Sequence, residues 1–308
     1  MIQLFTLFVF QYRVYNTKMM QKKFHRQDNI TPIEEISLSE EELQTGEITK
    51  QPEKLLGHES IFVVEIKNRL AIYKPRSLEQ VILGWEKIEP GTYYKHERAA
   101  YLVSHYLGLD IVPLTVIRDL GNGYGLGSIQ LFIPNAKTLS EWSPYKKPDK
   151  NNSKSQSRIE MMATLALFDI LIHETDRHSG NALFNEEFQL KEGGQLECRE
   201  NIYATDNGLS FGDARLRNFS ILTDIGKAGW LCGEEIPQKV AEKFGNFISS
   251  EQSIQNFKRV LKKEDLLTEK ESIALFARIN YLKTLIYSKN FPPASEVIQT
   301  LACYLPNI

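Results

Sequence analysis

The chain has 308 residues, of which 42% are hydrophobic and 25% are charged. This composition is typical of a globular protein and excludes an intrinsically disordered chain. The formal net charge is only −2, so the sequence gives no sign of a nucleic-acid partner or of strong attraction to an anionic membrane. Cys198, Cys232 and Cys303 are too few and too widely spaced for a disulfide framework or a zinc site, which favours a reducing compartment.

The amino-terminal segment MIQLFTLFVF is apolar, but it has no preceding basic region and no small-residue cleavage site. It is also shorter than the roughly 20 residues of a membrane span. We interpret it as an extra strand or a leader, with a membrane or secretion signal as the alternative. Because residues 26–54 are polar and acidic, we interpret residues 1–54 as a partly flexible leader. Within it, Ser39 and Glu42 have the spacing of a capping box at the start of a short helix.

Strand signals dominate residues 55–142. The runs SIFVVEI and RLAIYKP, separated by Lys67 and Asn68, predict an antiparallel hairpin. The segment YYKHERAAYLVSHYLGL has an apolar stripe at spacings of three and four, so it predicts a helix that ends at Gly108. The runs VPLTVIRD and GLGSIQLFI then predict two more strands.

Lys74 lies inside one of these apolar strands, where a buried ammonium group needs an anionic partner. Glu97 on the following helix is one candidate, and a phosphate of a ligand is another. The alternative is an edge-strand lysine whose side chain reaches into water.

A polar stretch, residues 143–157, predicts an exposed linker to a mainly helical second half, residues 158–308. This half opens with RIEMMATLALFDILIHE, an almost wholly apolar helix that we expect to be buried. In the loop that follows, Asp176 and Asn181 are five residues apart. This is the spacing of the hydroxyl-orienting aspartate and the metal-binding asparagine in a protein-kinase catalytic loop, although D-x-x-x-x-N is common by itself.

A second polar segment, ATDNGLSFG, places Asp206 at the end of an apolar strand. This is the position of the metal-binding aspartate in a kinase D-F-G segment, although Asp-Asn-Gly also forms simple turns. The intervening residues predict at least one hairpin, which would return Asp206 to Asn181. Two later stretches, SEQSIQNFKRVL and TEKESIALFARINYLKTLIYSK, are amphipathic and predict core helices.

Taken in order, these segments resemble the phosphatidylinositol 3- and 4-kinase superfamily, and locally the type II phosphatidylinositol 4-kinases and their small bacterial relatives. SIFVVEIKNRLAIYKP is similar to the nucleotide-loop hairpin, HERAAYLVSHYLGLDIVPLTVI to the next helix and strand, and GSIQLFIPNAKTLSEW to the hinge. LALFDILIHETDRHSGNALF and ATDNGLSF are similar to the catalytic loop and the metal-binding segment. The cysteine-rich segment of the eukaryotic type II enzymes is absent, and Gly57 is the single glycine of the nucleotide loop.

The resemblance implies an α+β, two-lobed protein-kinase-like fold, with a strand-rich N-lobe at 55–142, a linker at 143–157 and a mainly helical C-lobe at 158–308. It implies that Lys74 contacts the phosphates of ATP and that Glu97 orders this lysine. The other implied site residues are Asp176 for orienting the acceptor hydroxyl, Asn181 and Asp206 for holding Mg²⁺ or Mn²⁺, Gly57 and Ser60 in the nucleotide loop, and Gln130, Leu131, Phe132 and Ile133 around the adenine.

Three side-chain roles stay open at this point. His178 either stabilises the transferred phosphate or packs within the loop. Arg177 either supports the loop or has no functional role. Arg215 and Arg217 either meet a phosphorylated head group or are simply solvated.

The expected activity is therefore ATP- and Mg²⁺-dependent transfer of the γ-phosphoryl group to a hydroxyl. The acceptor would be a phosphoinositide lipid or, alternatively, a Ser/Thr side chain of a protein. A third hypothesis is a nucleotide-binding pseudokinase that serves as an interaction module. We expect a cytoplasmic protein, with peripheral contact to a membrane or delivery into a host cell as alternatives.

Overall fold

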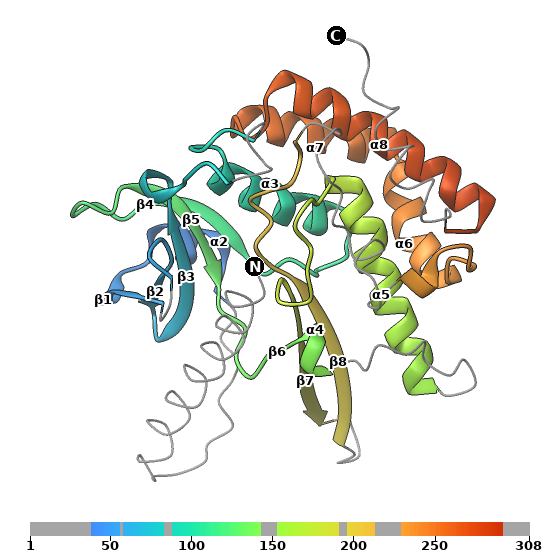
Figure 1. Cartoon of the computed structure of the whole chain (residues 1–308), viewed down its shortest axis with the longest axis horizontal. Helices are drawn as coiled ribbons and strands as arrows, with labels where there is room; N and C mark the ends of the chain where they lie inside the picture. The colour runs from blue at the N-terminus through green and yellow to red at the C-terminus, as the bar shows by residue number, and fades with distance from the viewer. Residues whose placement is uncertain are drawn as a thin grey trace.

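The structure is a computed structural model that describes residues 38–55, 58–82, 88–142, 153–190, 196–212 and 229–291. Figure 1 shows two lobes, with a sheet and a short helix in one and a group of longer helices in the other. Parts of the predicted chain lie outside the described residues, namely most of the leader and of the linker, Gly57, Arg215 and Arg217.

The N-lobe is built on a five-stranded antiparallel sheet with the order β1-β2-β3-β5-β4. Its strands are β1 (Ile48–Lys54), β2 (Phe62–Ile66), β3 (Arg69–Pro75), β4 (Thr115–Asp119) and β5 (Leu126–Leu131). The predicted hairpin is confirmed: β2 and β3 are joined by Lys67 and Asn68, whose φ angles of 49° and 63° suit a tight two-residue turn. Because β3 is the central strand of this sheet, Lys74 does not lie on an edge.

The N-lobe starts earlier in the chain than the sequence predicted. α2 (Glu40–Thr45) does begin with the expected capping box between Ser39 and Glu42. β1, however, pairs with β2, so residues 48–54 belong to the sheet and not to the leader. The sequence of β1 is polar because it is an edge strand with most of its side chains in water, and the apolar alternation that marks a half-buried strand is therefore missing.

α3 (Tyr93–Tyr106) connects the two lobes. Glu79, just after the 3₁₀ turn η1 (Arg76–Leu78), accepts hydrogen bonds from the backbone amides at the start of this helix, at 2.9 Å from Tyr93 N and 2.8 Å from Tyr94 N. The helix ends before Gly108, which has a φ of 63°, as predicted. Its buried alanine, leucine and valine side chains belong to the C-lobe core, in which the helices α5 to α8 also take part.

The C-lobe is arranged around α5 (Ser153–Ile172), whose residues from Met162 onwards are nearly all buried. α6 (Gln238–Ile248) and α8 (Glu269–Ser288) pack against α5, and α7 (Glu251–Lys263) packs against α3 and α6. Figure 1 shows α7 and α8 lying near α3. The two amphipathic helices near the carboxyl end are confirmed, whereas α6 was not predicted. Because α5 begins at Ser153, the last five residues of the predicted linker are helical.

A second sheet, with the order β6-β7-β8, brings the two polar segments together. It consists of β6 (Lys137–Thr138), which leads into α4 (Leu139–Trp142), and the hairpin of β7 (Ala182–Leu190) and β8 (Leu196–Ala204). At its base Ala182 pairs with Ala204, and Thr205 N donates to Asn181 O at 3.0 Å. The predicted return of Asp206 to Asn181 is therefore confirmed.

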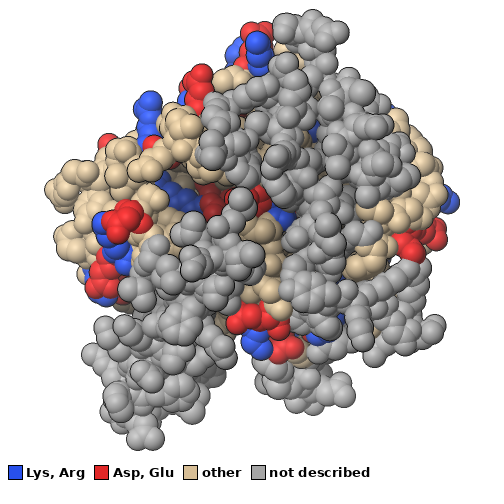
Figure 2. All heavy atoms as spheres, viewed as in Figure 1, with Lys and Arg blue, Asp and Glu red and all other residues tan. Residues whose placement is uncertain are grey.

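Charged side chains of both signs are spread over the described part of the face shown in Figure 2, which agrees with the small net charge. Apart from these elements, a short 3₁₀ turn, η2 (Gly229–Leu231), precedes α6. Among the described helices, none is both long enough and apolar enough to cross a membrane.

The contact between β3 and β5 allows no side chain at Gly127. A Cβ atom there would lie 2.4 Å from Lys74 O and 2.8 Å from the Cα of Pro75. We expect Gly127→Ala to lower the free energy of unfolding by about 1–3 kcal/mol, because the strands must separate. Gly245 in α6 has open space around it, so Gly245→Ala should raise this free energy by about 0.5–1 kcal/mol. Urea denaturation measures both, and equal effects would contradict this account of the β3–β5 contact.

Candidate active site

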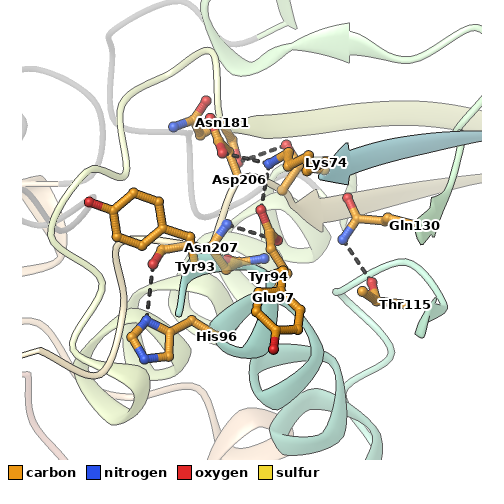
Figure 3. A network of polar contacts seen from close by, with 12 residues as sticks. Lys74, Tyr93, Tyr94, His96, Glu97, Thr115, Gln130, Asn181, Asp206 and Asn207 are labelled. Atoms are coloured by element: carbon orange, nitrogen blue, oxygen red, sulfur yellow. Dashed lines mark hydrogen bonds and ion pairs between the residues drawn. The ribbon is translucent and has the colours of Figure 1, made fainter. Parts of the chain in front are cut away.

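Lys74 lies at the centre of the site and is shared by two carboxylates (Figure 3). Its Nζ atom lies 2.5 Å from Glu97 Oε1 and 2.6 Å from Asp206 Oδ1. Burial by itself lowers the pKa of Lys74, but Asp206 and Glu97 outweigh this effect and raise the pKa above its ordinary value. The lysine is therefore charged, and Glu97 is its partner as the sequence predicted.

Glu97 has a second contact, which links α3 to the metal-binding segment. Its Oε2 atom accepts a hydrogen bond from Asn207 N at 3.1 Å, and its side chain is only 3% exposed. One carboxylate therefore holds both the strand that carries Lys74 and the segment that carries Asp206.

Asp206 has a φ of 58°, a left-handed conformation that is uncommon outside glycine. Burial alone would raise the pKa of this carboxyl, but Lys74 outweighs burial and lowers the pKa below its ordinary value. The carboxylate of Asp206 is therefore ionised. Because 47% of its side chain is exposed, its oxygen atoms can bind a metal ion in the cleft.

Asn181 and Asp206 supply the donor atoms that a hard divalent cation prefers. The side-chain amide nitrogen of Asn181 donates to Asp176 O at 3.1 Å, which leaves its amide oxygen to face a cation. In the described part of the chain, no three His, Cys, Asp or Glu side chains gather into a metal site. The carboxylate and amide oxygens of Asp206 and Asn181 fit a hard divalent cation, a kind of ion that commonly completes its coordination with phosphates and water.

Asp176 has a strongly perturbed carboxyl group. Burial, followed by the negative charges of Asp206 and Glu174, raises the pKa of Asp176 to about 8. A carboxyl group in this state is suited to accept a proton near neutral pH. A cation beside Asp206 would cancel part of this repulsion and would make Asp176 a weaker base.

Arg177 is fully buried and connects the catalytic loop to the metal-binding segment. Its guanidinium group donates to Asp169 Oδ1 at 3.1 Å, Asn181 O at 2.8 Å, Thr205 O at 2.6 Å and Asn207 Oδ1 at 2.5 Å. Of the two interpretations left open by the sequence, the structure supports the one in which Arg177 holds the loop. The planar guanidinium group suits this role because its N–H groups point in fixed directions.

His178 shapes the loop as a neutral ring. Its Nδ1 atom accepts a hydrogen bond from Gly180 N at 3.0 Å, so this nitrogen carries no proton. Burial also lowers the pKa of His178 below its ordinary value. This geometry favours the packing and hydrogen-bonding role over stabilisation of a transferred phosphate by a positive charge.

A largely apolar cavity lies beside Lys74, between the two lobes. Its lining includes Leu55, Ile61, Ile72, Gln130, Leu131, Phe132, Ile133, Leu183 and Asp206. The structure thus brings the predicted adenine residues to one cavity with Lys74. Gln130 donates through its side chain to Thr115 Oγ1 at 2.9 Å, and Phe132 N donates to Leu70 O at 3.0 Å. The amide of Phe132 is therefore not available to a base, and we expect the Phe132 carbonyl and Ile133 to make such contacts.

A second cavity, of about 310 Å³, lies on the other side of Lys74. Ser60, Asp176 and Asp206 line it together with residues of α3, including Tyr94. Asp176 therefore lines this second cavity and not the apolar one.

Several residues of the site were missed by the sequence analysis. Asp169 and Glu174 are completely buried, and both face Arg177. The signal was one acid within the almost wholly apolar α5 and a second just after its end, because buried carboxylates require cationic or hydrogen-bonding partners. Asn207 gave no comparable signal, since its contacts with Glu97 and Arg177 are distant in the sequence.

Comparisons with solved structures identify the architecture. A crystal structure of the Golgi casein kinase matches with a TM-score of 0.52 and 18% identity, covering 85% of this chain and 74% of that one. The chain has a protein-kinase-like fold. A second structure of the Golgi casein kinase, with Mn/ADP bound, matches with a TM-score of 0.51 and 17% identity, covering 80% of this chain and 74% of that one. The predicted two-lobed α+β class is therefore confirmed.

Sequence comparison adds one curated relative. Protein Rv2133c of Mycobacterium tuberculosis is 26% identical over 196 residues, which are 54% of this chain and 64% of that protein. The chain thus spans less than two thirds of this relative's length. No protein-family model matches the chain. The finer resemblance to phosphatidylinositol kinases stays a prediction.

The first prediction for the site concerns Arg177. We expect Arg177→Lys to lower the free energy of unfolding by about 3–5 kcal/mol, because the single nitrogen of a lysine cannot reach all four acceptors of Arg177 and leaves some of these buried groups without a donor. Arg259→Lys on α7 is the control, since the hydrogen bond from Arg259 to Asn256 Oδ1 is exposed and its loss should change the free energy of unfolding by about 0.5 kcal/mol or less. Similar losses for both variants in urea denaturation would refute the role given to Arg177.

The second prediction concerns the charge on Asp176. Because the pKa of Asp176 is raised, the protonated form favours the folded state, and this stability is lost as the pH rises towards about 8. Asp176→Asn should therefore raise the metal-free thermal midpoint by a few degrees at about pH 9 and much less at about pH 5. Calorimetry without metal tests this, and a difference that does not change with pH would contradict the burial and repulsion described here.

Proposed function

We propose that the protein is an ATP- and divalent-metal-dependent phosphotransferase that moves the γ-phosphoryl group to a hydroxyl. The observation that carries this proposal is the contact of Lys74 with both Glu97 and Asp206, next to the amide of Asn181. The Mn/ADP bound to the Golgi casein kinase supports the same nucleotide and metal chemistry in a protein of this fold.

In this mechanism each residue has one task. Lys74 binds the phosphates of ATP and remains oriented by Glu97. Asn181 and Asp206 would hold Mg²⁺, or Mn²⁺ as an alternative, and a cation held there would neutralise charge on the phosphates. Asp176 orients the acceptor hydroxyl in line with the γ-phosphorus and accepts its proton.

The acceptor that we propose is the hydroxyl of an inositol lipid. The support is the ordered resemblance of the hinge, catalytic-loop and metal-binding motifs to phosphatidylinositol 3- and 4-kinases. A peripheral position at a membrane, from the cytoplasm or after delivery into a host cell, would suit such an acceptor. A protein Ser/Thr acceptor is the second candidate, favoured by the likeness to the Golgi casein kinase.

A nucleotide-binding pseudokinase is disfavoured. Lys74, Asp176, Asn181 and Asp206 are all present, and each lies at or beside the cleft. A pseudokinase has no need to keep all four of these side chains in position.

The test uses radiolabelled ATP with Mg²⁺ or Mn²⁺ against phosphatidylcholine vesicles with and without phosphatidylinositol, and against casein. We expect label in phosphatidylinositol, and a loss of roughly 10²-fold or more in Asp176→Asn. Lys74→Met should also abolish transfer, whereas Lys54→Met, which removes a lysine of the same lobe that is 56% exposed, should not.

Label in casein without a lipid product would favour the protein acceptor. If wild type labels no acceptor and binds neither ATP nor Mn²⁺ with ADP, the phosphotransferase proposal is wrong. Binding without transfer would favour the pseudokinase.

A further inference from the structure

His96 is a fully buried histidine next to Glu97 on α3. Its Nδ1 atom lies 3.0 Å from Gly208 O in the metal-binding segment, and its Nε2 atom lies 3.1 Å from Glu271 Oε1 on α8. Figure 3 shows the His96 ring close to Asn207, with a dashed contact leaving the ring. One ring thus contacts the segment that carries Asp206 and a helix of the C-lobe.

Both partners of the ring are hydrogen-bond acceptors. A backbone carbonyl has no proton to donate, and neither has an ionised carboxylate. Burial by itself raises the pKa of Glu271, but its contacts with His96 and Thr268 lower the pKa below its ordinary value. Its Oε2 atom accepts hydrogen bonds from Thr268 N at 2.8 Å and from Thr268 Oγ1 at 2.9 Å, as an ionised carboxylate does. Both contacts are satisfied together only when each ring nitrogen carries a proton.

We propose that His96 is a positioning residue that, as an imidazolium ion, fastens the Asp206 segment to α8 through Gly208 and Glu271. This role rests on the proposed phosphotransferase function, because it fixes the carboxylate that would hold the metal ion. His96 itself touches neither nucleotide nor acceptor.

The contacts around Gly208 show why the ring controls this segment. Asn207 and Gly208 directly follow Asp206, and they are held by two consecutive residues of α3, Glu97 through Asn207 N and His96 through Gly208 O. A Cβ atom at Gly208 would lie 3.1 Å from the Cβ of Tyr93, so the helix also packs closely against the turn.

The other end of the connection is rigid. Glu271 also belongs to the capping box of α8, where its Oε2 atom accepts from Thr268 N at 2.8 Å. The ring of His96 packs against Phe211, with 5.6 Å between the ring centroids. Because Glu271 and the His96 ring are both held in place, the position of α8 fixes the position of Gly208 in the metal-binding segment.

Two neighbouring pairs provide an internal comparison. Lys95 pairs with Asp265 at 2.6 Å, and Arg98 pairs with Glu264 at 3.0 Å, so α3 contacts the region between α7 and α8 at several points. Asp265, however, is 87% exposed, and an ion pair of this kind contributes little. The His96 side chain, in contrast, is fully buried, and the same ring contacts both Glu271 and Gly208.

Two substitutions separate the two ends of the ring. The side-chain amide nitrogen of asparagine can take the place of Nδ1, whereas that of glutamine can take the place of Nε2. His96→Asn should keep the contact to Gly208 and lose the one to Glu271, and His96→Gln should do the opposite. Asp265→Asn is the matched control on the exposed pair.

If His96 positions Asp206, His96→Gln should weaken Mn²⁺ binding in the presence of ADP on the order of 10- to 100-fold, as loss of support behind a metal ligand does. His96→Asn should bind Mn²⁺ closer to wild type even where its thermal midpoint is lower, and Asp265→Asn should change neither quantity. Lower midpoints for both His96 variants with unchanged Mn²⁺ affinity would reduce His96 to a packing residue and overturn the proposal.

The charge on the ring is tested on the wild-type protein without any reaction. In NMR spectra of protein with isotope-labelled histidine, both ring nitrogens of His96 should have the shifts of a protonated imidazolium, with the signal assigned from its absence in His96→Asn. A neutral tautomer would overturn the inference. An imidazolium in a protein that transfers no phosphate would leave the connection intact and would refute the proposed function instead.

Discussion

The structure depends on the neutralisation of one ammonium group. Lys74 lies on the central strand of the N-lobe sheet, where its charge must be matched by anions. The two that match it come from positions 23 and 132 residues further along the chain. α3 has to pass close to β3 to bring Glu97, and the β7–β8 hairpin has to return the chain to bring Asp206. The main features of the topology thus serve to meet this one requirement.

Arg177 supplies hydrogen-bond donors to buried carbonyl groups of the catalytic loop. The loop turns sharply inside the protein, so its carbonyl groups have no water to bind. A buried guanidinium group supplies the missing donors, and Asp169 balances its charge. The two polar segments are therefore held against each other by a side chain that takes no part in the proposed chemistry.

Much of this could be predicted from local patterns, and the failures have physical reasons. The β2–β3 hairpin followed from two β-branched and aromatic runs separated by two residues, and α3 followed from the helical spacing of its apolar residues and from Gly108 after its end. Lys74 and Glu97 were paired correctly because a charge inside an apolar strand requires a partner. β1 was missed because an edge strand in water need not alternate. His96 and Asn207 could not be assigned, since their partners are set by the packing of helices and turns that no local spacing encodes.

The membership of α3 in the C-lobe core has a consequence for control of the protein. In many protein kinases the corresponding helix swings outward to break the lysine–glutamate pair and switch the enzyme off. Here such a swing would expose Leu102 and Val103 to water, at about 1.5–3 kcal/mol for each side chain, and would amount to partial unfolding. We therefore expect the Lys74–Glu97 pair to be formed whenever the protein is folded.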